Sequence, residues 1–342
     1  ATYAARAFGV NSGLGLMKAA ALAPDAVLLP VDFEQYRRYS RLFKDAVRAI
    51  APLVEDRGID EIYIDLTELP GAQDDGGRAI GQALKAAVFD VTGLTCSVGI
   101  TPNKLLSKLC SEFDKPDGLT LLQEDEIAQR IWPLPAKRIN GIGPKAAARL
   151  EALGIRSIGE LAAADPALLL STFAAHYGAW LHAAAHGRDA RPVVTFSEPK
   201  SISRETTFER DLHAVRDRAM LTPLLTELCI ALAGDLARKG YASRTIGIKL
   251  RFDDFRIVTR DLTLPAHTMD ARSIRRAAGE CLKRVDLTRR LRLLGVRAGA
   301  LARLADLVNP GASAGLLPSA MKAEERAAAY GLPLFDMPAP RD

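Results

Sequence analysis

Two hydrophobic periods alternate along residues 33 to 122. In residues 33 to 57, large apolar side chains return every three or four positions with charged residues between them, which predicts an amphipathic helix; they are Phe33, Tyr36, Tyr39, Phe43 and Val47. Residues 59 to 66 are instead rich in β-branched and aromatic side chains and predict a strand. A helix over 76–90, a strand over 94–100, a helix from 103 and a strand over 119–122 follow. Helices alternating with strands predict an α/β or α+β body.

The pattern changes character on both sides of this segment. Residues 1 to 32 are Gly/Ala-rich and predict one small helix that ends near Pro24, whereas residues 124 to 187 predict only helices. Residues 188 to 199 predict an extended linker. From 200 to 304 the predicted order is strand, helix, strand, strand, helix, strand, and the composition of 305–342 predicts disorder. The fold class predicted is therefore α+β and multidomain.

Charge is spread unevenly over these segments. The chain has a formal net charge of +5, but residues 200 to 304 hold 22 Lys and Arg against 12 Asp and Glu, and the remainder holds 24 against 29. This basic module predicts a polyanionic partner, and a merely solvated Arg-rich face is the alternative. No run of about 18 apolar residues and no secretory signal is visible. Four scattered cysteines without a CxxC favour a cytoplasmic setting.

Two adjacent carboxylates, Asp60 and Glu61, interrupt the apolar run that continues to Asp65. An ionised carboxylate in a largely buried strand is costly unless it is paired or holds a metal ion. Taken alone, the segment favours a strand end that leaves both side chains in solvent. The alternative is a metal site, which the rest of the chain supports.

A second pattern is typical of a helix–hairpin–helix motif: Asn140-Gly141-Ile142-Gly143-Pro144-Lys145, followed by a helix. Gly141 and Gly143 let the backbone turn tightly, so that its N–H groups approach a phosphate at the start of the next helix, and Lys145 adds charge. A plain helix–helix turn with a capping glycine is the alternative. In the basic module, five cations are expected to line one sheet face towards a phosphate backbone: Arg244, Lys249, Arg251, Arg256 and Arg260.

One apolar island, Gly331-Leu332-Pro333-Leu334-Phe335, stands out in the polar C-terminal tail. A compact apolar patch in such a tail predicts a docking peptide that binds through Leu332, Leu334 and Phe335. A chance cluster is the alternative.

Taken in order, these segments resemble the motifs of Y-family DNA polymerases of the bacterial DinB type, over nearly the whole chain. Residues 58–65 resemble the palm motif S-x-D-E-x-Y-x-D, and residues 1–10 resemble the fingers motif S-Y-E-A-R-x-F-G-V. Residues 97–104 with 115–118 resemble S-x-G-I-x-x-N-K…K-P-x-G, and the hairpin matches in position and type. Lys200-Ser201-Ile202 with Thr207-Phe208 resembles the opening of the little finger, and 331–335 is similar to the sliding-clamp motif Q-L-x-L-F.

The resemblance implies a right-hand polymerase with an α/β palm, small fingers, a helical thumb and a βαββαβ little finger. The implied parts are fingers over 1–32, palm over 33–122, thumb with the helix–hairpin–helix over 123–187, linker over 188–199, little finger over 200–304, and a flexible tail with the clamp-binding peptide over 305–342.

The resemblance also implies the reaction, which is template-directed transfer of a nucleotidyl group from a dNTP to a primer 3′-OH. Two Mg²⁺ ions about 3.5–4 Å apart would stabilise the attacking and leaving oxygens. Asp60 would be a ligand of both ions, and Glu61 would hold the ion that activates the primer hydroxyl. Tyr3, Arg6 and Lys115 would contact the triphosphate and neutralise its charge.

The implied partners are primer–template DNA, dNTP and, through the tail peptide, a sliding clamp. The family further implies a monomer with no membrane association, located in the cytoplasm at the nucleoid. Translesion synthesis during DNA repair, with a mutator effect, is the process that the family implies.

The sequence departs from the family pattern at several positions. Gly58 replaces the serine before the acidic pair, Ala4 replaces the usual glutamate after Tyr3, and Gly331 replaces the clamp motif's glutamine. The family's D-x-D-x-F-F segment, with its first metal-ligating Asp, is expected upstream of Ala1. The 342 residues alone are therefore expected to be catalytically crippled.

Two other interpretations compete. The first is a non-catalytic DNA- and clamp-binding adaptor of the same fold, against which the retained Asp60 and Glu61 argue. The second is a structural helix–hairpin–helix DNA-binding protein or nuclease, which leaves the fingers and palm motifs unexplained.

Overall fold

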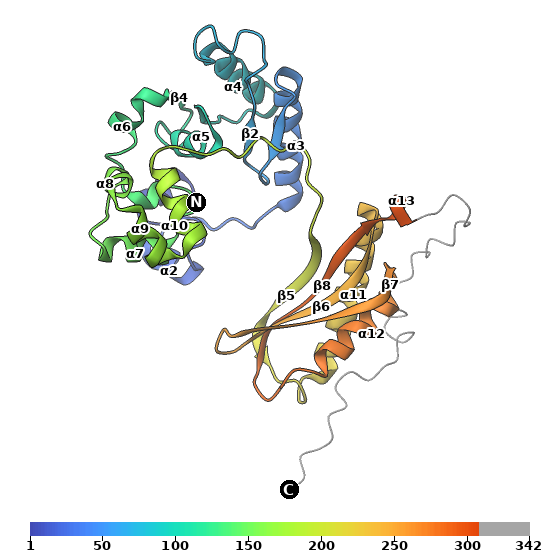
Figure 1. The fold of residues 1–342 in the computed structure, drawn as a ribbon. Helices are drawn as coiled ribbons and strands as arrows, with labels where there is room; N and C mark the ends of the chain where they lie inside the picture. The colour runs from blue at the N-terminus through green and yellow to red at the C-terminus, as the bar shows by residue number, and fades with distance from the viewer. Residues whose placement is uncertain (308–342) are drawn as a thin grey trace. The chain divides into compact units, whose positions relative to one another are not determined.

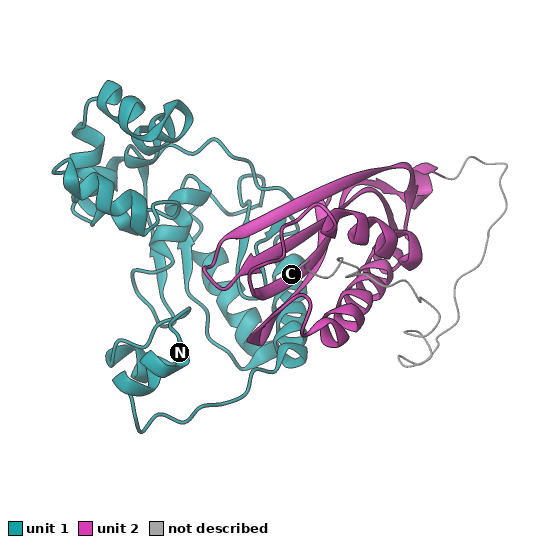
Figure 2. Ribbon diagram, turned by 90° about the horizontal axis from the view of Figure 1, so that it is seen from below, with its two compact units in different colours: residues 1–196 teal, residues 197–342 magenta. Residues whose placement is uncertain are grey.

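The computed structural model describes residues 1–307, and Figure 1 draws their ribbon. Contacts between Cα atoms divide the chain into two units, residues 1–196 and 197–342, which Figure 2 colours separately. The division falls inside the predicted linker. Each unit is described by itself below.

Unit 1 begins with two short helices. Helix α1 (Tyr3–Ala7) starts at Thr2, whose hydroxyl accepts a hydrogen bond from the Ala5 N–H at 3.2 Å. Helix α2 (Leu16–Leu22) is the small helix predicted before Pro24. The sequence pattern did not predict α1, which is only five residues long.

A helix, a hairpin and a second helix follow. Helix α3 (Phe33–Ile50) is shorter than predicted, because Pro52 has no N–H to continue it. Residues 51–57 were predicted as helix, and this was wrong, since they hold strand β1 (Val54–Asp56), which pairs antiparallel with β2 (Ile62–Ile64). Helix α4 (Arg78–Thr92) lies against α3, and the two share a small core with the hairpin.

Two further strands and a helix complete the predicted palm. Strands β3 (Val98–Ile100) and β4 (Leu119–Leu121) pair in parallel, and helix α5 (Lys104–Cys110) lies between them in sequence. The Asn103 side chain caps α5 by accepting from the Leu106 N–H at 3.1 Å. This arrangement confirms the predicted mixture of helices and strands, although each strand is only three residues long.

Residues 124–187 are helical, as predicted. The elements are η1 (Glu124–Glu126), α6 (Ile127–Arg130), η2 (Ala136–Arg138), α7 (Pro144–Ala152), α8 (Ile158–Ala163), α9 (Pro166–Phe173) and α10 (Ala175–Ala185). Their core includes Leu105, Leu106 and Leu109 of α5. Helix α5 therefore buries its apolar face against the helical part, and this leaves its lysines on the opposite side, towards the β1–β2 hairpin.

The end of unit 1 is an extended segment that lies along α5. The Asn103 amide donates to the Gly187 carbonyl at 2.7 Å, and Asp189 accepts from the Leu105 N–H at 3.1 Å. The Lys104 ammonium bridges the Glu55 carboxylate and the Pro192 carbonyl, both at 2.7 Å. These contacts fix the linker to the strand and helix that border the candidate site.

Unit 2 has the predicted order of elements: β5 (Ser201–Leu212), α11 (Arg218–Lys239), β6 (Tyr241–Phe252), β7 (Ile257–Thr268), α12 (Ala271–Leu282) and β8 (Leu291–Arg303), then the short α13 (Leu304–Leu307). The strands form one antiparallel sheet in the order β5-β8-β6-β7. Helices α11 and α12 cover one face (Figure 1), and the other face carries no helix among the described residues.

Helix α11 is long and apolar enough to cross a membrane by length and composition. Its apolar side chains are nevertheless those of a core helix, because Leu221, Leu225, Leu232 and Leu236 are fully buried against the sheet. The predicted clamp-binding residues Leu332, Leu334 and Phe335 lie outside the described residues.

A buried carboxylate links two elements of unit 2 and yields a stability prediction. Asp235 on α11 is 6% exposed and accepts from the Arg204 guanidinium of β5 at 2.5 and 2.8 Å. These hydrogen bonds from Arg204 lower the pKa of Asp235. Arg238 of the same helix also pairs with Asp235. We expect Asp235→Asn to lower the free energy of unfolding at pH 7 by about 1–2 kcal/mol, since the side chains of Arg204 and Arg238 are 47% and 66% exposed and screened by water.

The pH dependence of this effect follows from the direction of the pKa shift. A carboxyl whose folded-state pKa is depressed stabilises the fold fully above its unfolded pKa of about 4, and this contribution disappears as pH falls through the folded value. Urea denaturation at pH 7 and pH 3 should therefore show a smaller difference between wild type and Asp235→Asn at pH 3. Glu280→Gln, in an exposed pair with Lys283, is the control and should change stability little at either pH.

Candidate active site

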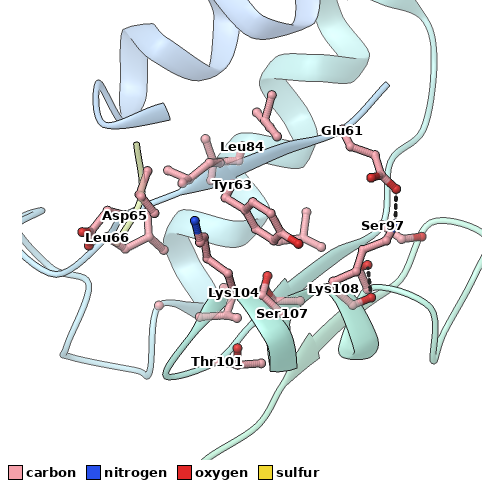
Figure 3. Close-up of a pocket in the computed structure, with 18 of the residues that line it drawn as sticks. Glu61, Tyr63, Asp65, Leu66, Leu84, Ser97, Thr101, Lys104, Ser107 and Lys108 are labelled. Atoms are coloured by element: carbon pink, nitrogen blue, oxygen red, sulfur yellow. Dashed lines mark hydrogen bonds and ion pairs between the residues drawn. The ribbon is translucent and has the colours of Figure 1, made fainter. Parts of the chain in front are cut away.

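Unit 1 contains a pocket of about 810 Å³. Its walls come from the β1–β2 hairpin, the start of α5, the loop around Lys115 and the linker at Arg191, and Tyr3 of α1 also borders it. Figure 3 shows how Tyr63, Lys104 and Lys108 lie within it. Segments far apart in the sequence thus meet around one open space lined by both polar and apolar side chains.

Asp60 and Glu61 lie at the rim of this pocket, in the turn just before β2 rather than inside a strand. Gly58 has φ +136°, which a residue with a side chain rarely adopts, and this bends the chain before the pair. Both carboxylates are exposed, so the burial cost that the sequence suggested does not arise here. The interpretation as a solvated strand end describes their surroundings better, yet they open onto the pocket.

Lys44 holds the turn that precedes Asp60 and Glu61. The Lys44 ammonium of α3 is buried and donates to both Asp56 carboxylate oxygens at 2.9 and 2.8 Å and to the Gly58 carbonyl at 2.5 Å. Three hydrogen bonds use all the donors of an ammonium group. They hold the backbone two residues before Asp60.

Charges of opposite sign alternate along the pocket wall. Glu61 forms an ion pair with Lys108 of α5, Lys108 lies 4.0 Å from Glu112, and Glu112 pairs with Lys115 at 2.5 Å. Burial tends to raise the pKa of Glu112, but its contacts with Lys115 and Lys108 outweigh burial and the pKa lies below its ordinary value. Glu61 stands at one end of this series and Lys115 at the other. In a complex with a metal-bound triphosphate, Glu61 would face the metal and Lys115 the phosphates.

The structure brings together most of the residues predicted to bind substrate. Tyr3 and Lys115 border the same pocket as Asp60 and Glu61. Arg6 does not border it, and its guanidinium instead lies 5.7 Å from the centre of the Tyr3 ring.

Two lysines that border this pocket and one that contacts its Lys115 loop were not singled out from the sequence. Lys104 and Lys108 are four residues apart, so they lie on one face of α5, and Lys85 of α4 reaches the Lys115 loop. The spacing of Lys104 and Lys108 was a readable signal. No feature of the sequence around Lys85 indicates that its side chain contacts the Lys115 loop.

The donor set fits a magnesium ion shared with phosphate. Mg²⁺ is usually held by one or two carboxylates together with substrate phosphates and water. Asp60 and Glu61 offer such a pair at an accessible rim. Among residues 1–307 no group of three or more His, Cys, Asp or Glu side chains is placed to hold an ion without further ligands.

The predicted hairpin is present and presents its backbone to solvent. Gly141 has φ +114°, and a Cβ there would lie 2.5 Å from the Trp180 ring, so the position requires glycine. Gly143 precedes α7, nothing lies within 4 Å of a Cβ at that position, and Lys145 is exposed in the first turn. An exposed helix start with free N–H groups and a lysine is suited to a phosphate.

The uncovered face of the unit 2 sheet carries some of the predicted cations. Ile246, Ile248 and Leu250 of β6 point into the core, so alternation places Lys249 and Arg251 on the opposite face. Arg297 of β8 lies opposite Gly247 and joins them, although the sequence did not single it out.

Two other predicted cations lie elsewhere. Arg260 pairs with the buried Ile248, so it lies on the helix-covered face, and its placement on the same face as Lys249 was wrong. Its Nε donates to the Arg284 carbonyl at 3.3 Å. Arg244 falls where the register of β6 shifts, and it donates to the Leu264 carbonyl at 3.3 Å. Alternation alone could not reveal a shift of register.

Three segments match models of one family. The matches are residues 1–112 to the impB/mucB/samB family, residues 124–155 to the helix–hairpin–helix motif of the same family, and residues 199–309 to its C-terminal domain. Together they include Asp60 and Glu61 at the candidate pocket, the hairpin and the sheet of unit 2.

Relatives with curated names are DNA polymerase IV proteins. That of Streptomyces coelicolor is 37% identical over 302 residues, which are 88% of this chain and 62% of that protein. That of Methanoculleus marisnigri is 38% identical over 300 residues, covering 88% and 82%. That of Caulobacter vibrioides is 36% identical over 295 residues, covering 86% and 72%.

Among solved structures, a chimeric Y-family DNA polymerase superposes with a TM-score of 0.72 at 24% identity, covering 87% of this chain and 86% of that one. At this identity the likeness concerns the fold, and it supports the predicted right-hand α+β architecture.

Proposed function

Because the chain belongs to the impB/mucB/samB family of Y-family DNA polymerases, we propose that it transfers a nucleotidyl group from a dNTP to a primer 3′-OH under the direction of a template strand. The observation that carries the proposal is the meeting of Asp60, Glu61, Tyr3 and Lys115 around one pocket. Translesion synthesis is the role that family membership supports.

The proposed roles follow from the chemistry of each side chain. Asp60 and Glu61 would supply part of the ligand set of two Mg²⁺ ions next to the triphosphate, and the bound ions would supply charge stabilisation for the attacking and leaving oxygens. Lys115 would pair with the triphosphate as a point charge, and Tyr3 would contact it from the side of α1. Arg6, next to Tyr3, would engage the triphosphate only after its side chain turns towards the pocket.

A two-ion site needs more carboxylate than this pair provides. Because residues 1–307 hold no cluster of three metal-ligating side chains, we propose that residues 1–342 alone extend primers slowly. The test is primer extension with Mg²⁺ and four dNTPs by residues 1–342 and by the long form, defined as the product of the nearest upstream in-frame start codon. Equal extension by both, at rates in the usual range of enzyme turnover of about 1–10³ s⁻¹, would refute this proposal.

We also propose that DNA is held at two places, the Gly141–Lys145 hairpin in unit 1 and the uncovered sheet face in unit 2. Both present backbone N–H groups or cations suited to phosphates, without a feature that reads bases. In unit 2, Lys249 is paired with Glu205 and Arg297 with Asp261, so binding DNA would exchange carboxylates for phosphates.

Removing two of these cations should weaken DNA binding in a salt-dependent way. We expect Lys249→Ala with Arg251→Ala to make the slope of log affinity against log salt shallower by about 1.8, because each lost phosphate contact removes about 0.9. Fluorescence anisotropy with a labelled primer–template between 50 and 300 mM NaCl measures the slope. Arg276→Ala with Lys283→Ala, an equal charge change at α12, should leave it nearly unchanged.

The second candidate function is a non-catalytic DNA-binding adaptor of the same fold. The absence of a third metal ligand among the described residues is what favours it. DNA binding without extension by the long form would establish it. Clamp binding through Leu332, Leu334 and Phe335, and a monomeric state, are further proposals that pull-down with a purified clamp and light scattering would test.

A further inference from the structure

Lys85, in the middle of α4, has only 16% of its side chain exposed and contacts two segments that the chain brings together from far apart. Its ammonium donates to the Cys96 carbonyl at 2.6 Å and to the Asp117 carbonyl at 2.8 Å, and it also pairs with the Asp117 carboxylate. These three acceptors use all three donors of the ammonium group. Burying a lysine to this extent is costly unless its ammonium group is paired. The Lys85 side chain is therefore expected to keep these three contacts.

The anchored loop is the one that carries Lys115. Asp117 has φ +61°, in the left-handed region that Asp adopts more readily than most residues, and Lys85 contacts both its carbonyl and its carboxylate. The neighbouring Gly118 N–H donates to the Ser97 hydroxyl at 3.1 Å, and the Thr120 hydroxyl donates to Asp114 at 2.7 Å. Of these contacts, the hydrogen bond from Lys85 reaches the loop at Asp117, two residues after Lys115.

We propose that Lys85 is a positioning residue that sets the place of Lys115 for the triphosphate of the incoming nucleotide. This rests on the proposed function, since it requires Lys115 to bind the triphosphate. Lys85 borders neither the carboxylate pair nor the pocket itself, so its effect must pass through the loop. Without Lys85, Asp117 loses its partner at the carbonyl and at the carboxylate together, and the loop shifts relative to Asp60 and Glu61.

The experiment is steady-state single-nucleotide insertion by the long form with Lys85→Met, Lys85→Arg and Lys115→Ala. We expect Lys85→Met to raise KM for dNTP about 10-fold, with kcat changed by less than about 3-fold, since a small misplacement of a binding group weakens ground-state contact. Lys85→Arg, which keeps charge and donors, should hold KM within about 3-fold of wild type. A merely structural loss would lower kcat and primer–template affinity together and would not be rescued by arginine.

Lys44→Met is the matched control. Lys44 is a similarly buried lysine with three hydrogen bonds, but its partners are Asp56 and Gly58 on the side of the carboxylate pair. We expect this variant to lower kcat and to leave KM for dNTP within about 3-fold, so the two lysines should give opposite kinetic signatures. A rise of KM in both variants to the same extent would overturn the inference.

Two further outcomes separate this inference from the proposed function. If Lys115→Ala raises KM and Lys85→Met does not, Lys85 has no positioning role and the proposed function stands. If Lys115→Ala leaves KM unchanged, the role proposed for Lys115 fails and the inference fails with it. Should Lys85→Met not fold, Asp117→Gly tests the same link at an exposed side chain that tolerates the left-handed backbone, with an expected 2- to 5-fold rise of KM.

Discussion

Glu61→Gln in the long form is expected to lower the rate of nucleotide insertion on the order of 10³-fold or more, with primer–template affinity nearly unchanged. The carboxylate lies at the pocket rim, where it would hold the ion that activates the primer hydroxyl. Loss of one group that stabilises developing charge typically costs about 10²–10³-fold, and a metal ligand is at least as demanding. Asp60→Asn should reduce insertion similarly, since Asp60 would contact both ions.

Single-turnover insertion and anisotropy, measured on the same preparations, separate chemistry from DNA binding. Titration with Mn²⁺ in the presence of dNTP, read by electron paramagnetic resonance, should show weaker ion binding in both variants. Glu68→Gln is the control, because Glu68 is exposed and near in sequence but does not border the pocket. Insertion within about 10-fold of wild type by Glu61→Gln would be too small an effect for a metal ligand and would contradict its role.

Much of unit 2 could be predicted from the sequence because its strands are long. Strands of 12 or 13 residues show clear alternation, as in β6, where Ile246, Ile248 and Leu250 mark the core face. The order of elements followed from this pattern. The register shift at Ser243 did not, because an inserted residue changes the face of everything beyond it and leaves no mark on composition.

Unit 1 was harder to predict because its strands are three residues long. A strand this short has no measurable period, so the residues of β1 were predicted as part of the preceding helix. Pro52 was the one signal that the helix ends before them. Asp60 and Glu61 were found through the mismatch of charge with an apolar run. Lys44 and Lys85 were not, because a single lysine in an amphipathic helix looks the same whether it faces water or anchors a loop.

In the row of alternating charges from Glu61 to Lys115, each charged side chain has a partner of opposite charge before substrate binds. Lys108 neutralises Glu61, and Glu112 neutralises Lys115. Incoming metal and triphosphate would each have to displace one of these partners. Lys108 and Glu112, 4.0 Å apart, would then remain to pair with one another. In the proposed mechanism, Glu61 and Lys115 would thus be partnered at every stage.

Lys115→Ala is therefore expected to lower kcat/KM for dNTP insertion by about 30- to 150-fold, which corresponds to about 2–3 kcal/mol for a charge-assisted contact with phosphate. Most of the loss should appear in KM, because a cation that grips the triphosphate in the ground state contributes to binding before the reaction. Lys115→Arg should lower kcat/KM less, since it keeps the positive charge, although the planar guanidinium differs in shape from the compact ammonium group.

Glu112→Gln is the informative companion to that variant. It removes the carboxylate that competes with the triphosphate for Lys115 but leaves the lysine in place. The KM for dNTP should then stay level or fall by at most about 5-fold, because an exposed ion pair of this kind is worth at most about 1 kcal/mol. A large rise of KM in Glu112→Gln would mean that Glu112 holds Lys115 in its binding position. Lys115 would then need Glu112 as well as the Lys85 anchor to meet the triphosphate.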